Sequence, residues 1–216
     1  MAIGIFGGTF NPVHWGHIRT AVEIKNALVL EKMLLLPCGM PPHREQPEVS
    51  SEMRLEMLKL AVKDFPELEI DDRELKRKGP SYSVDTLQSL RTEMPEKTFA
   101  LSVGADAFLY LNTWHQWRKL FDLAHIIVAH RPGWSVDEVT EKLPDELQKE
   151  FTQRYVSDIT KIEEKKSGYI VELKVTEIDI SSSDIRQRVA RNDSISGLVP
   201  AAVEGYIKKH GLYQRS

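Results

Sequence analysis

The sequence predicts an α/β fold with an open parallel sheet and helices on both faces. Short apolar runs alternate along the chain with segments of helical periodicity, as in right-handed strand–helix–strand crossovers. The runs Met33–Leu36 and Ile126–Ala129 are apolar at consecutive positions. A strand that is apolar on both faces is typical of the buried centre of a parallel sheet.

Strands and helices are expected in alternation. The expected strands are Ala2–Phe6, Lys32–Pro37, Glu67–Asp71, Thr98–Val103, Ala124–His130 and Tyr169–Val175. The expected helices are Gly16–Leu28, Ser51–Asp64, Ser83–Met94, Gln116–Leu123, Ser183–Arg191 and Pro200–His210. The proline-rich segment Cys38–Ser50 is expected to be a long, shaped loop, which is often functional. The charged segment 134–168 predicts a partly helical surface insertion, either a solvated excursion or a lid or oligomer contact.

Length and composition limit the class of protein. A chain of 216 residues can bury one good core, and we expect a single domain over residues 1–216. A formal net charge of -3 gives no basic field for nucleic acid. Cys38 is the only cysteine, which fits a reducing compartment. Without a secretory signal or an apolar run near the roughly 20 residues that span a bilayer, a cytoplasmic protein with no membrane partner is expected.

The strongest functional signal lies directly after the first expected strand. Glycines let a backbone approach a phosphate closely, a helix N-terminus supplies free N–H groups, and imidazoles donate hydrogen bonds to phosphate oxygens. A protonated imidazole would add positive charge. The two histidines are expected on one face of the first helical turn. Gly7 and Gly8 are the glycines and His14 and His17 the imidazoles, and Thr9 lies between them after the strand.

A dinucleotide, Walker A or metal site fits this segment less well than a phosphate site. The glycines match neither the G-x-G-x-x-G dinucleotide fingerprint nor a Walker A loop. A metal site on His14 and His17 lacks an obvious third ligand nearby. A tight turn followed by surface histidines is the remaining structural alternative.

A second phosphate site is predicted near the other end of the chain. Ile180–Arg186 follows an expected strand and opens a helix, so Ser182 and Ser183 offer hydroxyls and free N–H groups. Arg186 lies one turn into this helix and can reach a phosphate at its N-terminus. The alternative is an ordinary N-cap with a surface arginine.

Both segments resemble signatures of one superfamily. Gly7–His17 resembles the first signature of the nucleotidyltransferases with the His-x-Gly-His motif, whose Rossmann-like core is shared with class I aminoacyl-tRNA synthetases. Asn11 stands where aspartate is commoner, which we expect to be tolerated because the family's phosphate contacts come from the backbone and the histidines. Ile180–Arg186 resembles the second signature, which holds the β- and γ-phosphates of ATP, with Ser183 in place of threonine.

Further features between the signatures narrow the resemblance. Pro41–Arg44, Gly79–Leu87 and Val103–Asp106 offer cations, hydroxyls and a carboxylate suited to ribose. Trp114 and Trp117 could stack on a heterocycle or belong to the core. Together these segments are similar to the bacterial nicotinate-nucleotide adenylyltransferases, from the first strand to Leu212–Tyr213.

The resemblance implies a role for each segment. Trp114 would stack on the pyridine ring, and Thr86 with the backbone around Tyr82 would hold the nicotinate carboxylate. The residues implied for nicotinate mononucleotide are Thr9, His43, Arg44, Tyr82, Thr86 and Trp114. Those implied for ATP are Gly7, Gly8, Thr9, Phe10, His17, Gly104, Asp106, Arg131, Ser182, Ser183 and Arg186.

The implied reaction joins ATP and nicotinate mononucleotide into deamido-NAD and pyrophosphate. His14, His17 and Arg186 would be catalytic by stabilising charge, and Mg²⁺ would accompany ATP, held mainly by substrate and water. Rival hypotheses are a transferase acting on nicotinamide mononucleotide or phosphopantetheine, a redox enzyme that binds NAD, and a noncatalytic nucleotide sensor. The sequence leaves homo-oligomer formation open.

Overall fold

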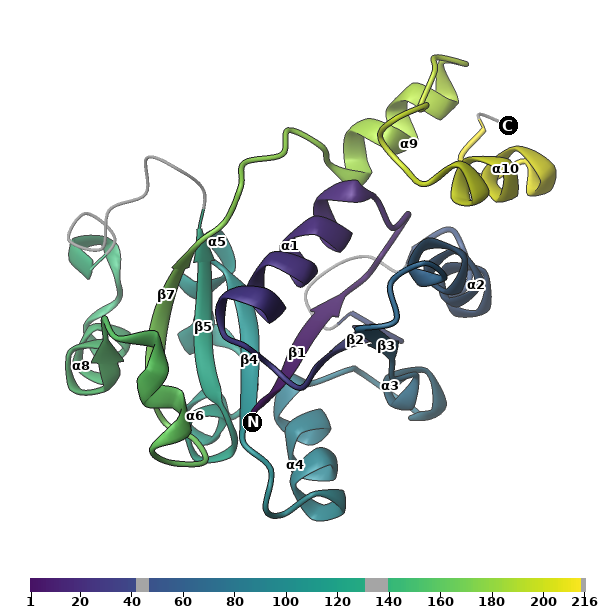
Figure 1. Cartoon of the computed structure of the whole chain (residues 1–216). Helices are drawn as coiled ribbons and strands as arrows, with labels where there is room; N and C mark the ends of the chain where they lie inside the picture. Colours follow the sequence, from purple (N-terminus) through teal and green to yellow (C-terminus); the bar gives the residue numbers. More distant parts are fainter. Residues whose placement is uncertain (42–46, 131–139, 215–216) are drawn as a thin grey trace. The chain divides into compact units, whose positions relative to one another are not determined.

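The computed structural model describes residues 1–41, 47–130 and 140–214 (Figure 1). Contacts divide the chain into two compact units, each built from three chain segments. Unit 1 comprises Met1–Phe6, Glu23–Leu34 and Tyr82–Glu177, and unit 2 comprises Gly7–Val22, Leu35–Ser81 and Ile178–Ser216. The boundaries run through β1, α1 and β2, so several elements contribute to both units.

Within the described ranges the strands form a seven-stranded sheet with the order β3-β2-β1-β4-β5-β7-β6. Their bounds are β1 (Ile3–Gly8), β2 (Lys32–Pro37), β3 (Leu68–Ile70), β4 (Phe99–Gly104), β5 (His125–His130), β6 (Tyr155–Val156) and β7 (Ile170–Lys174). The pairs β1–β4, β4–β5, β5–β7 and β6–β7 are parallel. The predicted α/β class with a Rossmann-like parallel sheet is confirmed. Every expected strand is present within one or two residues, and among the described strands only the short β6 was not foreseen.

The helices also follow the predicted order. They are α1 (Trp15–Ala27), α2 (Ser51–Val62), α3 (Arg73–Lys76), α4 (Ser83–Glu93), α5 (Ala105–Phe108), α6 (Leu120–Leu123), α8 (Asp145–Arg154), α9 (Ser182–Ala190) and α10 (Ala201–His210). Three short 3₁₀ turns are described at Leu111–Thr113, Trp117–Lys119 and Ile159–Glu163. The predicted helix Gln116–Leu123 is wrong at its start, because Gln116 has a left-handed φ of 49° and precedes a 3₁₀ turn. A left-handed residue cannot continue an α-helix.

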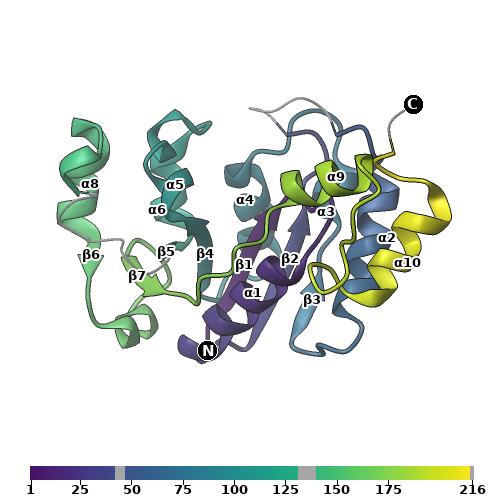
Figure 2. The ribbon, with the colours of Figure 1, turned by 90° about the horizontal axis from the view of Figure 1, so that it is seen from above.

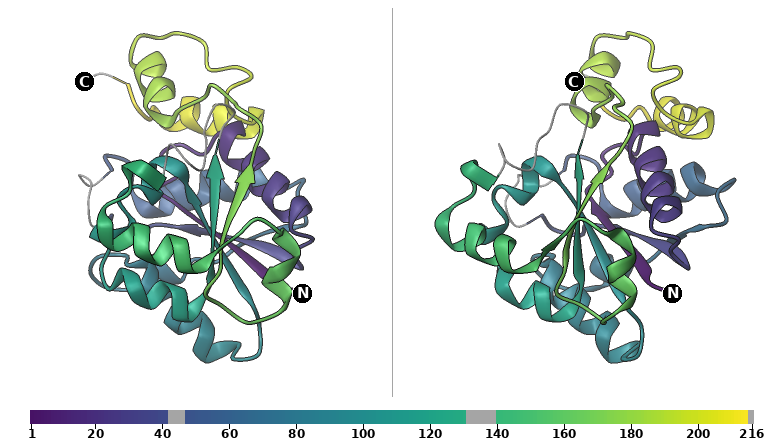
Figure 3. Two further views of the ribbon diagram at one scale, coloured as in Figure 1. Left: turned by 90° about the vertical axis from the view of Figure 1, so that its left-hand side faces the viewer. Right: turned by 60° about the vertical axis from the view of Figure 1, so that its left-hand side comes forward.

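Unit 1 has its core on β4 and β5, where nearly every side chain is buried. The helices α5 and α6 pack on these strands, and α4 packs on α6. Figure 3 shows β5 and β7 running side by side, in agreement with their parallel register from Ile126↔Ile170 to His130↔Lys174.

The segment expected as a surface insertion contributes to this core. Its described part holds α8, β6 and a 3₁₀ turn, and β6 pairs with β7. Its buried apolar side chains are Leu143, Leu147, Phe151 and Ile162. The single-domain assignment and the lid or oligomer role stay predictions.

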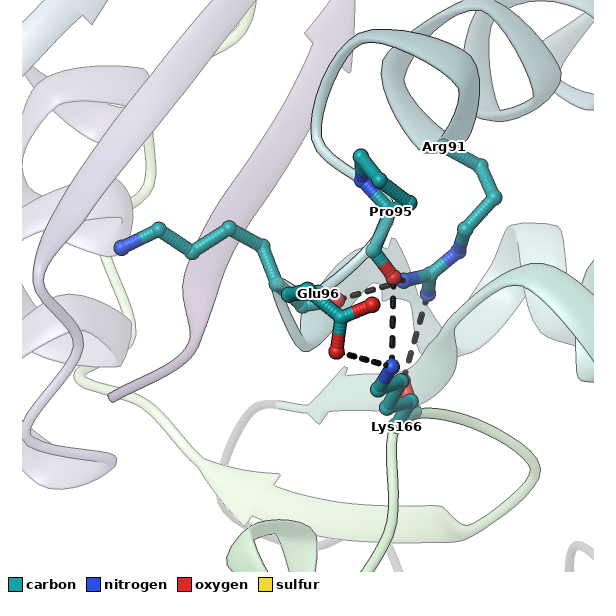
Figure 4. A network of polar contacts seen from close by, with 5 residues as sticks. Arg91, Pro95, Glu96 and Lys166 are labelled. Atoms are coloured by element: carbon teal, nitrogen blue, oxygen red, sulfur yellow. Dashed lines mark hydrogen bonds and ion pairs between the residues drawn. The ribbon is translucent and has the colours of Figure 1, made fainter.

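Arg91 connects the loop after α4 to the end of α6 within unit 1 by hydrogen bonds (Figure 4). Its guanidinium donates to the carbonyls of Pro95 at 3.2 Å and Leu123 at 2.7 Å. Nearby, Lys166 Nζ forms an ion pair with Glu96 at 2.7 Å. The Leu123 carbonyl is half-buried and needs such a donor, because an unpaired buried carbonyl costs about 1–3 kcal/mol.

Unit 2 carries the chain segments with the two signatures. It contains α2 and α10, which pack against each other and lie side by side in Figure 2. Ser50 caps α2 by accepting from the Met53 N–H at 3.4 Å. Gly211, with a left-handed φ of 59°, ends α10 in the way that glycine favours.

Candidate active site

The loop after β1 is shaped by two glycines with different tasks. A Cβ on Gly8 would lie 3.0 Å from the ring of Phe10, so glycine leaves room for that ring. A Cβ on Gly7 would meet no atom within 4 Å, so open space lies beside its backbone. Phe10 has a left-handed φ of 49°, unusual for a side chain of its size, and its ring is buried. The Asn11–Pro12 peptide bond is cis.

The two histidines lie in contact in unit 2. Their rings stack with centroids 3.7 Å apart. The prediction that both belong to the first helical turn is wrong for His14, which precedes α1 and accepts the His17 N–H at 3.0 Å with its carbonyl. Gly16 makes this packing available, because a Cβ there would lie 2.9 Å from Cε1 and Nδ1 of His14. The glycine of the His-x-Gly-His motif therefore accommodates the first histidine.

The contacts and burial of these rings indicate their protonation. The backbone N–H of His14 donates to Nδ1 of His17 at 3.3 Å, which assigns the His17 proton to Nε2. Burial lowers the pKa of His14 to about 4. Burial, and then the neighbouring His14, lowers the pKa of His17 well below its usual range. Both rings are therefore neutral N–H donors at pH 7 in this state, and a bound anion would have to raise these pKa values before either ring could add positive charge.

The second signature meets the first within unit 2. Ser181, just before α9, caps this helix by accepting the Asp184 N–H at 3.1 Å. Ser182 Oγ donates to the Pro12 carbonyl at 2.9 Å. Arg186 donates to the Asn11 carbonyl at 2.8 Å and to Ser183 Oγ at 3.4 Å. Segments from opposite ends of the sequence thus hold one loop, and the described residues leave Arg186 further N–H donors for a ligand.

Asn11 has a partner that the sequence did not suggest. The Tyr213 hydroxyl donates to Asn11 Oδ1 at 2.7 Å. Burial raises the pKa of Tyr213, so its hydroxyl stays protonated and available as a donor. An asparagine oxygen accepts this bond as a carboxylate would, which gives a physical reason why the departure from aspartate is compatible with the loop.

Arg54 is the second residue that the sequence analysis missed. It donates to the carbonyls of Thr9 at 2.6 Å and Gly39 at 3.2 Å. Burial lowers the pKa of this guanidinium. A signal was present, because Arg54, Met57, Leu58 and Ala61 occupy the spacing of one buried helix face. An arginine on an otherwise apolar helix face indicates a buried charge that binds polar groups in the folded chain.

The remaining predicted residues of the described ranges lie in unit 1. Tyr82 precedes α4, and its ring packs on His115 with centroids 4.4 Å apart. Thr86 lies on the buried face of α4, and Asp106 is exposed in the first turn of α5. Trp114 is half-buried.

Trp117 follows the core alternative, since it is 7% exposed and packs edge-on against Phe121. Gly104 lies at the end of β4, and a Cβ at this position would meet no atom within 4 Å. His43, Arg44 and Arg131 lie outside the described residues.

Neither a metal cluster nor a membrane-spanning helix occurs in the described part of the chain. No group of three or more His, Cys, Asp or Glu side chains there could hold a metal ion. No helix there is long and apolar enough to cross a membrane.

Comparison with known proteins finds relatives that match almost the whole chain. The pattern of the cytidylyltransferase-like family matches residues 5–188. A protein of Dechloromonas aromatica named "Probable nicotinate-nucleotide adenylyltransferase" is 43% identical over 215 residues, covering 99% of this chain and 98% of that protein. A protein of the same name from Chromohalobacter salexigens is 44% identical over 213 residues, covering 98% and 95%.

Similarity to solved structures supports the same fold. The nicotinic acid mononucleotide adenylyltransferase of Plasmodium falciparum in complex with NaAD has a TM-score of 0.75 and 17% identity, covering 98% of this chain and 97% of that one. At this identity the match shows the fold alone. The full-length relatives at more than 40% identity show more. On their evidence, the chain belongs to the nicotinate-nucleotide adenylyltransferase family.

Proposed function

We propose that this protein transfers the adenylyl group of ATP to nicotinate mononucleotide, giving deamido-NAD and pyrophosphate, as a step of NAD biosynthesis. The observation that carries this proposal is the joining of both signatures in unit 2. Arg186 and Ser182 bind the carbonyls of Asn11 and Pro12, in the loop that presents the stacked histidines. Family membership supplies the identity of the substrates.

The transfer is a direct displacement at phosphorus. An oxygen of the mononucleotide phosphate attacks the α-phosphorus of ATP, and the bond to the β-phosphate oxygen breaks, so pyrophosphate leaves with the electron pair. A phosphate monoester dianion needs no general base. Catalysis then depends on positioning and on stabilising the charge that develops on the α-phosphoryl oxygens.

The residues of unit 2 fit these tasks. His17 carries its proton on Nε2 and donates it to an α-phosphoryl oxygen, with His14 beside it. The backbone around Gly7 and Gly8 lets a phosphate approach. Arg186 and Ser183, one turn apart on α9, hold the departing pyrophosphate.

The residues of unit 1 are proposed to bind the mononucleotide and the riboses. Among the described residues the first turn of α4 shows no side-chain cap, so backbone N–H groups at the start of this helix and the Tyr82 backbone can receive the nicotinate carboxylate, together with Thr86. Trp114, half-buried, offers an indole face for the pyridine ring. Gly104 and Asp106 would receive ribose hydroxyls. Roles for His43, Arg44 and Arg131 rest on the family resemblance.

Mg²⁺ is proposed to arrive with ATP rather than as a resident ion. The cation would be held mainly by the ATP phosphates and water, since Mg²⁺ usually keeps several waters and binds through substrate phosphates. The ion would neutralise phosphate charge, and the protein's own donors would orient the phosphates around it. A cytoplasmic location fits these substrates and a chain whose only cysteine is Cys38. A homo-oligomer remains a hypothesis that light scattering tests by mass.

Pyrophosphate release tests the proposal directly. The protein is incubated with Mg-ATP and, in separate reactions, with nicotinate mononucleotide, nicotinamide mononucleotide, phosphopantetheine or no acceptor. We expect the highest kcat/KM with nicotinate mononucleotide and a dinucleotide product in equal amount to pyrophosphate. A clear preference for either other acceptor assigns a different transferase. Nucleotide binding without release with any acceptor supports the sensor hypothesis.

A further inference from the structure

Arg54 is a buried charge that the proposed reaction does not yet use. The residue is 1% exposed and is the largest of the fully buried side chains. Within the described part of the chain it forms no ion pair with a carboxylate, and its Nε has no hydrogen-bond partner. Burying a charge without a carboxylate partner costs several kcal/mol, and an apolar side chain of similar volume is often more stable. Stability alone is therefore a poor explanation for arginine here.

The guanidinium of Arg54 connects two loops with one planar group. It donates to the Thr9 carbonyl at 2.6 Å and to the Gly39 carbonyl at 3.2 Å. Gly39 is fixed on other sides as well, because its N–H donates to Ser81 Oγ at 3.0 Å and a Cβ would lie 2.6 Å from the Glu74 carbonyl oxygen. Gly39 is therefore held in place, and its carbonyl fixes one end of the Arg54 guanidinium. The other end of the same planar group then fixes the position of the Thr9 carbonyl.

Thr9 leads directly to the catalytic candidates. The next residue, Phe10, has a left-handed φ of 49°, which costs an L-residue about 1–2 kcal/mol. Its buried ring packs edge-on against His17, with centroids 5.1 Å apart. A charged hydrogen bond to the preceding carbonyl limits the rotation that would relieve this conformation. The chain of contacts therefore runs from Arg54 through Thr9 and Phe10 to His17.

We propose that Arg54 is a positioning residue for His17: its fork holds the Thr9 carbonyl against the anchored Gly39, and so fixes Phe10 and the imidazole that Phe10 supports. Arg54 does not touch the reacting atoms. The kinetic part of this inference rests on the proposed adenylyl transfer, whereas the placement of His17 can be measured without substrates.

Two substitutions separate positioning from simple packing. Arg54→Met retains most of the volume and removes the charge and both hydrogen bonds. Arg54→Lys retains the charge but, as a point donor, cannot hold both carbonyls in one plane. Arg91→Met is the matched control, because Arg91 also donates to several backbone carbonyls but lies in unit 1, on α4. Each variant is checked for folding by circular dichroism and thermal unfolding.

The first readout is the division between kcat and KM at saturating Mg-ATP. For Arg54→Met we expect kcat to fall about 10- to 100-fold, the scale for a misplacement of up to about 1 Å, with both KM values less affected. Arg54→Lys should recover part of that loss. Arg91→Met should keep the wild-type kcat even if its Tm falls.

The second readout is the ¹⁵N spectrum of the histidine side chains in the ligand-free protein, with His17→Gln used for assignment. The wild type should show His17 with its proton on Nε2, as the His14 N–H···Nδ1 bond requires. Arg54→Met should shift or broaden this signal, and Arg91→Met should not. If the wild-type protein shows no transfer activity, the proposed function is refuted. The His17 signal still tests whether Arg54 positions His17, because it is measured without substrates.

The inference is overturned if the His17 signal and kcat of Arg54→Met both match the wild type, or if either changes equally in Arg91→Met. It is also overturned if kcat falls while the His17 signal stays unchanged, since the loss then has another origin. If Arg54→Met does not fold, Arg54→Lys is judged by the same criteria.

Discussion

Replacing Gly16 by alanine tests the packing that supports the histidines. A Cβ at this position would lie 2.9 Å from Cε1 and Nδ1 of His14 and 3.7 Å from the Ile180 carbonyl oxygen. The second distance is an ordinary contact, and the first is not. His14 must therefore move, although its ring is buried and stacked on His17 at 3.7 Å.

The size of the effect follows from these distances. Heavy atoms at ordinary contact are about 3.5–4.0 Å apart, so the ring must shift by roughly 0.6–1 Å. A misplacement of about 1 Å can cost roughly 100-fold in rate, and we expect kcat for Gly16→Ala to fall about 30- to 100-fold. The free energy of unfolding should change little, because two effects oppose each other. Alanine stabilises a helix by about 1 kcal/mol relative to glycine, whereas overpacking against His14 destabilises by about 1–3 kcal/mol.

Gly205→Ala is the matched control. Gly205 lies within α10, and a Cβ there would meet no atom within 4 Å. This variant should gain about 0.5–1 kcal/mol in unfolding free energy with unchanged kcat. Steady-state pyrophosphate release and urea unfolding on both variants provide the assay. A folded Gly16→Ala protein with wild-type kcat would refute the packing argument, as would an equal loss in Gly205→Ala.

Three further predictions concern other parts of the site. Tyr213→Phe should lower the unfolding free energy by about 1–3 kcal/mol, because it leaves Asn11 Oδ1 without its 2.7 Å donor. Asn11→Asp keeps an acceptor oxygen and should change the unfolding free energy by much less. Equal losses for the two variants in urea titrations would argue against this contact. Trp114→Ala should raise the KM for nicotinate mononucleotide far more than the KM for ATP, and equal increases would contradict stacking on the pyridine ring. Burial holds the pKa of His14 near 4, below the 6.5 of the unfolded chain, so its contribution to stability is present above pH 6.5 and is lost as the pH falls toward 4. Between pH 7.5 and 4.5 the wild type should therefore lose about 2–3 kcal/mol more than His14→Gln in urea unfolding, and parallel losses would show that His14 is not held neutral.

The sequence predicted those parts of the fold that hydrophobic pattern determines. Runs such as Met33–Leu36 are apolar on both faces because their strand is buried, and β2 has the expected bounds Lys32–Pro37. Local pattern could not foresee α3 or α5, which are single turns of four residues. It also could not foresee the left-handed Gln116, because nothing in a polar residue between tryptophans indicates that conformation.

The site divides in the same way. Gly7, Gly8, His14, His17 and Arg186 carry their chemistry in residue type and spacing, so the sequence could indicate them. The tasks of Arg54 and Tyr213 arise from contacts across 45 and 202 residues of sequence. Such contacts are tertiary, and only a folded chain reveals which carbonyl or amide each donor meets. The neutral state of the histidines is likewise a consequence of burial that residue type alone does not give.

The central claim is that His17 stabilises the transition state of adenylyl transfer. Single-turnover formation of deamido-NAD at saturating Mg-ATP measures this step in wild type, His17→Ala and His210→Ala, whose histidine is exposed at the end of α10. We predict a rate about 10²–10³-fold lower for His17→Ala, the scale for losing one preorganised donor, and an unchanged rate for His210→Ala. A folded His17→Ala protein that turns over at nearly the wild-type rate would contradict the claim.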